Sequence, residues 1–199
     1  MRKIGVVNFM SLDGFFAGPK GEIDWFNSIR KDDEFARYNR EHARSGGALI
    51  FGRTTYEMMK NYWPTPEAIK DDPDMAGVLD NTPKIVFSKT LPGVLEGPNW
   101  KNIRLFHEIN REEIMKLKEE SGKDMVILGS GTIVQQFANL GLIDGYSLMI
   151  VPVVLGEGKP LLKDIKKMDL ELLEAKAFKN GVVLLNYRPT NNQGYLQNS

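Results

Sequence analysis

Short apolar segments alternate with helical segments through most of this 199-residue chain, and this alternation is the strongest constraint on its fold. Buried strands are predicted at residues 4–10, 48–51, 84–88, 103–106, 125–128 and 146–154. Helices are predicted to begin at Asp32, Gly52, Asn110 and Thr132. Strands that alternate with helices form parallel sheets covered on both faces, so we expect an α/β fold with a mixed, mostly parallel sheet of about eight strands.

The end of the chain departs from this alternation. Residues 170–177 and 182–188 read as two strands of an antiparallel hairpin that turns near Asn180-Gly181. The hairpin argues against a flavodoxin-like fold that binds FMN, because that fold alternates strands and helices to its end. Residues 64–73, with three prolines, are predicted to be a polar loop. We expect one domain at residues 1–190 and a polar tail at residues 191–199.

Composition excludes several classes of function. Lys plus Arg and Asp plus Glu both number 26, so no bulk charge points to a nucleic-acid or membrane partner. No cysteine is present, which excludes a disulfide framework and a thiolate nucleophile. The two histidines, His42 and His107, lack the spacing of metal ligands, and no metal site is expected. The chain shows no secretion signal or membrane span, and we expect it in the cytoplasm.

The clearest chemical signal is the Gly129-Ser130-Gly131 loop between a predicted strand and a predicted helix. Backbone N–H groups and the helix dipole at such a helix start favour an anion, and glycines let a phosphate approach the backbone. The alternative is a tight turn without a ligand. Val134 stands where the dinucleotide fingerprint of the doubly wound fold has its third glycine, so that motif is absent.

Two further junctions carry side chains that suit a phosphate. In Gly52-Arg53-Thr54-Thr55 the guanidinium could pair bidentately with a phosphate, or a threonine could simply cap the helix. In Ser88-Lys89-Thr90 a hydroxyl and an ammonium follow a strand, although an ordinary polar turn is the alternative. Three such junctions in one sheet suggest an extended ligand with more than one phosphate.

The chain resembles the dihydrofolate reductase superfamily, and within it the reductase domain of riboflavin-biosynthesis deaminase-reductases. The resemblance extends from about Lys3 to Arg188. It rests on the order and spacing of four motifs: SLDGFFAG at residues 11–18, GRTTYE at 52–57, GSGT at 129–132 and PVVLGEG at 152–158. It implies a three-layer dihydrofolate-reductase-like fold, NADPH as cofactor and a homodimer.

The resemblance also implies places for the cofactor. Residues Gly129, Ser130, Gly131, Thr132, Ile133 and Val134 would hold the pyrophosphate, together with Gly52, Arg53, Thr54 and Thr55, which would also contact the 2′-phosphate. Ser88 and Lys89 would lie at the adenosine end, and backbone groups near Phe9, Phe16 and Ala17 would orient the nicotinamide. A positive pair such as Arg53 and Lys89 would favour NADPH over NADH.

The substrate side is less defined. Asp13 or Asp33 could orient the substrate or relay a proton; the alternatives are an Asx-type turn for Asp13 and dipole complementation at a helix start for Asp33. Trp25 and Phe35 could wall a pocket for a flat ring, or they could belong to the core. The spacing from Trp25 to Asp32, Asp33 and Glu34 differs from that in dihydrofolate reductases proper, and the chain lacks the zinc deaminase domain of the riboflavin branch.

We therefore expect an NADPH-dependent oxidoreductase that acts on a small pterin-like or ribosylaminopyrimidine-like molecule, similar to the riboflavin-pathway reductases or to dihydrofolate reductase. One alternative is a nucleotide-binding homodimeric module without catalysis. Another is a homodimeric scaffold that uses the apolar segment at residues 146–154 as its interface, although that segment could equally be the centre of the sheet.

Overall fold

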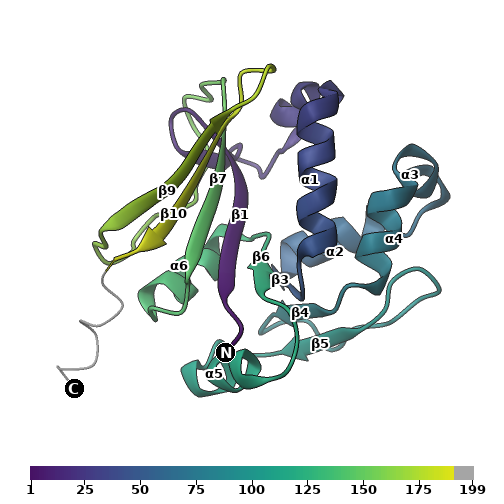
Figure 1. Cartoon of the computed structure of the whole chain (residues 1–199). Helices are drawn as coiled ribbons and strands as arrows, with labels where there is room; N and C mark the ends of the chain where they lie inside the picture. Colours follow the sequence, from purple (N-terminus) through teal and green to yellow (C-terminus); the bar gives the residue numbers. More distant parts are fainter. Residues whose placement is uncertain (191–199) are drawn as a thin grey trace.

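An eight-stranded mixed sheet organises the computed structural model, which describes residues 1–190 (Figure 1). The strand order is β5-β4-β3-β6-β1-β7-β10-β9. Its strands are β1 (Ile4–Ser11), β3 (Leu49–Gly52), β4 (Lys84–Phe87), β5 (Ile103–Phe106), β6 (Met125–Ile127), β7 (Gly145–Val151), β9 (Leu170–Ala177) and β10 (Val183–Pro189). The predicted tail at residues 191–199 lies outside the described residues.

The pairing matches the predicted mixture of directions. Strands β5, β4, β3, β6, β1 and β7 all run parallel to one another, whereas β10 runs antiparallel to both β7 and β9. The closing hairpin is thus confirmed. Strand β7 lies between β1 and β10 with Tyr146, Leu148 and Met149 buried, so the segment proposed as a scaffold interface is the interior of the sheet.

Helices cover both faces of the sheet. They are the 3₁₀ helix η1 (Asp24–Lys31) and the α-helices α1 (Asp33–Ser45), α2 (Arg53–Tyr62), α3 (Pro66–Asp71), α4 (Pro73–Asn81), α5 (Arg111–Glu119) and α6 (Gly131–Asn139). Apolar residues of α5 and α6 pack on one face with Ile4 and Val6 of β1. Residues of α1, α2 and α4 pack on the other face. The three-layer arrangement predicted from the sequence is therefore confirmed.

Residues 64–73 are not the loop that the prolines suggested. Pro66 and Pro73 occupy the first turns of α3 and α4, where proline costs no hydrogen bond because the first N–H groups of a helix have no helical partner. The side chains of Thr65 and Asp72 cap these helices by accepting hydrogen bonds from the N–H of Ala68 (3.2 Å) and Met75 (3.0 Å). The prediction treated proline as a breaker and missed its role at a helix start.

A second, two-stranded sheet stands beside the ends of β1 and β7. Strands β2 (Phe15–Ala17) and β8 (Lys159–Pro160) pair antiparallel. Gly158 makes this approach possible, since a Cβ there would lie 2.5 Å from the carbonyl oxygen of Ala17. These strands have two or three residues and no apolar periodicity, so the sequence did not indicate them.

Candidate functional site

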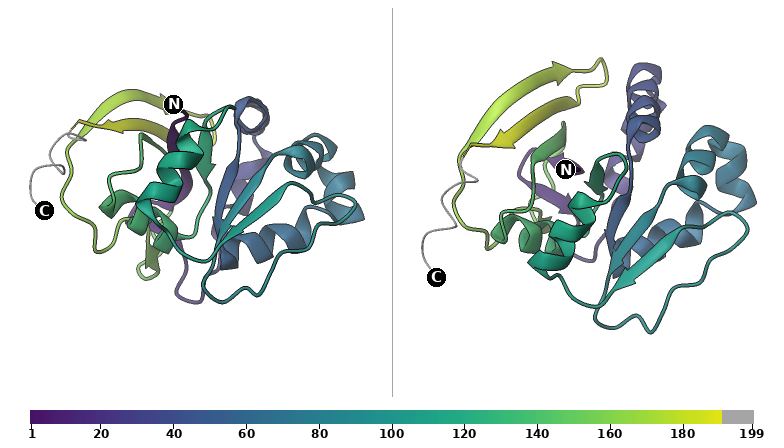
Figure 2. Two further views of the ribbon diagram at one scale, coloured as in Figure 1. Left: turned by 90° about the horizontal axis from the view of Figure 1, so that it is seen from below. Right: turned by 60° about the horizontal axis from the view of Figure 1, so that its bottom comes forward.

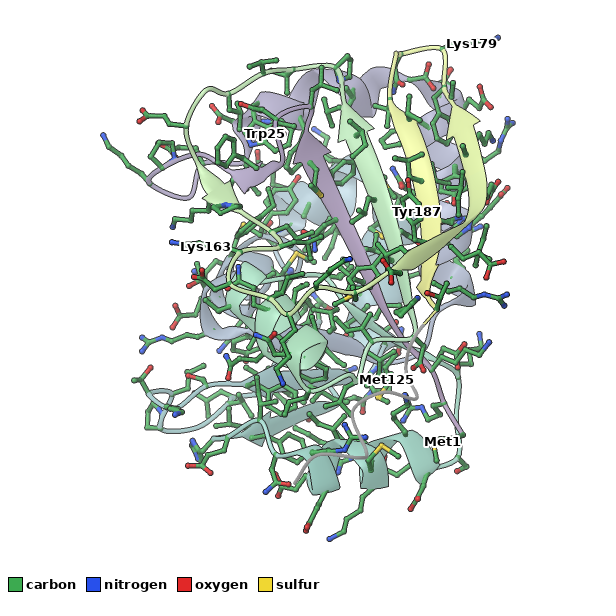
Figure 3. The ribbon with its side chains drawn as sticks, turned by 90° about the vertical axis from the view of Figure 1, so that its left-hand side faces the viewer. Met1, Trp25, Met125, Lys163, Lys179 and Tyr187 are labelled. Atoms are coloured by element: carbon green, nitrogen blue, oxygen red, sulfur yellow. The ribbon has the colours of Figure 1, made fainter. Side chains whose placement is uncertain are left out.

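The carboxyl ends of β1, β3, β4 and β6 lie at one edge of the sheet, because these strands run parallel. Open α/β sheets bind ligands at this edge. In Figure 3 Trp25 marks the end of the molecule toward which the arrowheads of β1 and β7 point, whereas Met1 and Met125 lie at the other end. Helices α2 and α6 both begin at this carboxyl edge; α2 follows β3 directly, and α6 follows β6 after the short loop at residues 128–130.

The starts of α2 and α6 differ from those of the four other α-helices. Helices α1, α3, α4 and α5 each have a side-chain cap, supplied by Asp32, Thr65, Asp72 and Asn110 respectively. Helices α2 and α6 begin after Gly52 and Ser130, and neither makes a side-chain cap hydrogen bond. Their first N–H groups and the positive ends of their dipoles are therefore available to an anion.

Glycines bring these two helix starts together. The N–H of Gly52 donates to the carbonyl of Gly129 at 3.0 Å. A Cβ on Gly52 would lie 2.6 Å from Ser130 Oγ, and a Cβ on Gly129 would lie 3.0 Å from Thr55 Oγ1. Gly129 also has φ +121°, a region that other residues rarely adopt. The predicted junctions at residues 52–55 and 129–132 thus form one surface.

Phe16 covers the start of α6. A Cβ on Gly131 would lie 2.6 Å from its ring, so glycine is required for the aromatic ring to reach this position. Ser130 Oγ and Thr132 Oγ1 are hydrogen-bonded at 2.8 Å. Ile133 and Val134, also predicted as cofactor residues, are buried in the core, so any contact that they make with a ligand is through the backbone.

Arg53 links the second and third predicted junctions. Its guanidinium donates to Glu57 Oε1 and to Thr90 Oγ1, both at 2.9 Å. About half of the Arg53 and Glu57 side chains is exposed, so this ion pair is weak and a phosphate can compete for the guanidinium. The arrangement places a cation between the start of α2 and the turn after β4.

In the turn after β4, Ser88 has a structural role. Its buried hydroxyl accepts hydrogen bonds from the N–H groups of Thr90 (3.3 Å) and Leu91 (3.1 Å). This is the ordinary polar turn that the sequence offered as an alternative. Lys89 is exposed beside it, as is Thr54 at the start of α2.

Asp13 joins the turn after β1 to the loop after β7. Its carboxylate accepts hydrogen bonds from the N–H groups of Leu155 (3.1 Å) and Gly156 (2.8 Å). The Ser11 hydroxyl and these backbone N–H groups hold the pKa of Asp13 below its ordinary value of 3.8, against the opposing effect of desolvation. The carboxylate is therefore ionised at neutral pH and anchors a distant loop.

Asp33 is exposed in the first turn of α1, where the neighbouring Asp32 caps the helix. Its position fits complementation of the helix dipole. Neither Asp13 nor Asp33 is buried, and the fully or nearly buried polar side chains of the described residues are Asn8, Ser11, Lys84, Ser88 and Lys118. No carboxylate is thus buried in the described part of the chain.

The aromatic residues divide between core and site. Phe35 is fully buried against Phe9 and Phe178, so its ring is core and does not wall an open pocket. Phe9 stacks on Phe26 with ring centroids 4.6 Å apart. Trp25 is half-buried, and its indole N–H, which is inaccessible to solvent, has no partner among the described residues. Trp25 therefore stays a candidate for substrate contact.

Sequence reasoning missed Asn8. It lies in β1 two residues beyond Val6, which pairs with Ile127 near the end of β6. The residue is 9% exposed, and its Nδ2 group has no hydrogen-bond partner in the described part of the chain. The signal was available, since Asn8 is a polar residue in the middle of an apolar strand. A buried donor without a partner is costly unless a ligand or water accepts from it.

Residues 2–184 match the model of the RibD C-terminal domain family. The chain belongs to this family. It is 32% identical over 179 residues to the uncharacterized protein YyaP of Bacillus subtilis (strain 168), a match that covers 89% of this chain and 90% of YyaP. The family and the fold together support a reductase-type function.

Two solved structures illustrate the fold of this RibD C-terminal domain. A putative riboflavin biosynthesis protein from Shewanella sp. PV-4 superposes with a TM-score of 0.72 at 21% identity, over 95% of this chain and 99% of that chain. Dihydrofolate reductase from Enterococcus faecalis, solved in complex with NADP(H), superposes with a TM-score of 0.63 at 15% identity, over 95% of this chain and 97% of that chain. The dihydrofolate-reductase-like fold expected from the sequence is confirmed.

In the described part of the chain no helix is long and apolar enough to cross a membrane. The same residues contain no group of three or more His, Asp or Glu side chains that could hold a metal ion.

Proposed function

We propose that this protein is an NADPH-dependent reductase of a small conjugated heterocycle, of the pterin or ribosylaminopyrimidine class, in the cytoplasm. The observation that carries the proposal is the pair of helix starts without side-chain caps, α2 and α6, which meet at Gly52 and Gly129. A diphosphate needs two adjacent sets of donors, and this junction supplies them. The cofactor bound there would supply a hydride to the substrate.

The residues of this chain would bind and orient the cofactor. Backbone N–H groups at Gly131 and Thr132 and at Arg53 and Thr54 would hold the diphosphate, and the Arg53 and Lys89 side chains would pair with the 2′-phosphate. The Asn8 amide would donate to a polar group of the nicotinamide end. Phe16, which covers the start of α6, would exclude water from the diphosphate.

The test is a titration with NADPH and with NADH, followed by tryptophan fluorescence and nicotinamide emission. We expect saturable binding with a preference for NADPH. In Arg53→Ala, NADPH binding should weaken by about tenfold or more while NADH binding stays unchanged, because a hydrogen bond to a charged group contributes about 1.5–3 kcal/mol. Lys60→Ala, which removes a cation from the other end of α2, is the matched control.

Binding of neither nucleotide would overturn the proposal. If NADPH binds, its oxidation should accelerate in the presence of dihydrofolate or a ribosylaminopyrimidine, measured as loss of absorbance. The absence of a buried carboxylate among the described residues favours a second candidate, a nucleotide-binding module without catalysis. That candidate predicts binding of NADPH without oxidation by any such substrate.

A further inference from the structure

A cavity of about 640 Å³ opens at the amino-terminal edge of the sheet, opposite the candidate cofactor site. It lies between the ends of α1 and α4, the starts of β3, β4 and β6, and the turn after α5. The left panel of Figure 2 looks onto this edge, with α1 seen end-on and α5 toward the viewer. Its volume is in the range of sites that bind small molecules.

The cavity concentrates positive charge. Four basic side chains line it, those of Arg2, Arg44, Arg104 and Lys123, and among the described lining residues they face one carboxylate, that of Glu120. Arg44 is also paired with Asp74, outside the lining, at 2.8 Å, so the excess comes from Arg2, Arg104 and Lys123. The whole chain has equal numbers of acidic and basic residues, so this excess is local. Apolar residues also line the cavity, among them Val78, Pro83 and Ile85. The lining therefore suits an anion with an organic part.

The ion pairs in the cavity do not neutralise all of its positive charge. Arg104 takes both oxygens of Glu120, at 2.8 and 2.9 Å. Arg2 lies 3.8 Å from the same carboxylate and donates its Nε to the carbonyl of Lys123 at 2.6 Å. Its side chain is 10% exposed, so its charge is largely withdrawn from water. The Glu120 carboxylate is thus shared by two guanidinium groups, and a bound anion would neutralise the remaining positive charge.

Helix dipoles do not account for all of these cations. Helices α1, α4 and α5 end at the cavity, and basic residues commonly offset the negative end of a helix. At the end of α4, however, a different residue already offsets the negative end of the helix dipole. Lys84 Nζ donates to the carbonyls of Asp80 (3.1 Å) and Thr82 (2.8 Å). Lys84 does not line the cavity, so the lining cations are additional to it. At the end of α1, Lys123 Nζ donates to the carbonyl of Arg44 at 3.4 Å, a long hydrogen bond that leaves the ammonium able to contact an anion as well. Arg2 donates to no helix-end carbonyl among the described hydrogen bonds of its side chain, since its Nε bonds the carbonyl of Lys123 in the turn after α5.

We propose that this cavity is a second binding site, which takes a small phosphorylated metabolite. The Arg2 and Arg104 guanidinium groups and the Lys123 ammonium would pair with the phosphate oxygens, since guanidinium groups match phosphate bidentately. The organic part would contact Val78, Pro83 and Ile85. The site is separate from the carboxyl edge, so this proposal does not rest on the proposed function.

Isothermal titration calorimetry with inorganic pyrophosphate tests the site, and substitutions in the cavity separate binding there from binding at the carboxyl ends of the strands. We expect saturable binding that weakens as ionic strength rises. Arg104→Ala and Lys123→Ala should each weaken binding about tenfold, because each removes a charged hydrogen-bond donor to the phosphate. Arg104→Ala also frees Glu120 to pair with Arg2 and so to compete with the anion. Lys163→Ala, an exposed lysine away from the cavity, is the matched control and should change nothing.

Glu120→Gln gives the sharper test because its effect has the opposite sign. Removing the competing carboxylate should strengthen pyrophosphate binding several-fold, a result that damage to the fold cannot produce. Citrate serves as a carboxylate probe and should bind more weakly than pyrophosphate. No binding of pyrophosphate, binding that is insensitive to Arg104, Lys123 and Glu120, or tighter binding of citrate would each overturn the proposal.

Discussion

Asp13 joins two loops that lie more than 140 residues apart in the sequence. The sequence offered two roles for it, a proton relay or a residue that caps its own turn. The structure shows a third, in which the carboxylate anchors the loop after β7. Leu12 strengthens the same junction through its N–H, which donates to the carbonyl of Val153 at 2.8 Å. No local pattern could reveal an acceptor for N–H groups so distant in sequence.

Asp13→Asn separates anchoring from catalysis. An amide presents one acceptor oxygen where the carboxylate presents two, so one N–H of Leu155 or Gly156 should lose its partner and the loop should loosen. We expect faster hydrogen exchange at these two amides and several-fold weaker NADPH binding, with kcat changed less than KM. Loss of kcat with unchanged NADPH binding would instead support the proton-relay hypothesis, and Asp33→Asn should be tested in parallel.

The same anchor should depend on pH. The pKa of Asp13 is lower in the folded protein than its ordinary value of 3.8. The stability that the ionised carboxylate contributes is therefore complete above pH 3.8 and is lost as pH falls through the lower pKa of the folded protein. The amide shifts of Leu155 and Gly156 in NMR spectra should therefore stay constant from neutral pH to about pH 4 and change below it. In Asp13→Asn this change should be absent; an identical change in both proteins would contradict the account.

At the scale of the elements, glycine sets how closely Phe16 approaches the start of α6. Gly131→Ala should displace that ring by adding a Cβ 2.6 Å from it, while alanine suits the helix itself. We expect NADPH binding to weaken about tenfold, with unfolding free energy lowered by about 1–3 kcal/mol, the range for overpacking. Fluorescence titration and denaturant unfolding measure the two effects.

Gly77→Ala is the matched control for this prediction. Gly77 lies inside α4, and a Cβ there would meet no atom within 4 Å. Alanine should therefore stabilise the protein by roughly 0.5–1 kcal/mol and leave NADPH binding unchanged. Equal binding by the two variants and the wild type would show that the start of α6 does not hold the cofactor.

Elements with strong local patterns were predictable from the sequence, and elements created by tertiary contacts were not. The apolar run at residues 4–10 and the cap at Asn110, which accepts from the N–H of Glu112 at 2.8 Å, correctly predicted β1 and α5. Helix α3 was missed because Thr65-Pro66 was read as a loop. Strand β8 was missed because it exists through pairing with β2, which no local pattern encodes.

The outline of the candidate site was predictable because its two main junctions also have strong local patterns. Glycines next to apolar strands marked the junctions at Gly52 and Gly129, because close backbone approach requires them. The burial of Phe35 and the hydroxyl role of Ser88 depend on residues distant in sequence or on turn geometry, so the sequence left both open.

At the scale of the whole molecule, β9 is an edge strand of the eight-stranded sheet and exposes Leu172 and Leu173. Edge strands with exposed apolar side chains tend to pair with another chain, which supports the expected homodimer. We predict twice the mass of one chain by light scattering at micromolar concentration, and a monomer for Leu173→Glu. Leu95→Glu, at an exposed leucine outside the sheet, should leave the dimer intact, and a monomeric wild type would contradict this prediction.

The central claim is that α2 and α6 together hold the diphosphate of NADP(H). Backbone amide NMR of the full chain during titration with NADP⁺ tests it most directly, because each amide reports its own environment. We predict saturable shifts at Arg53, Thr54, Gly131 and Thr132, with small changes at Gly122 and Lys123 on the opposite edge. Shifts confined to the opposite edge, or no shifts at the four amides, would contradict the account.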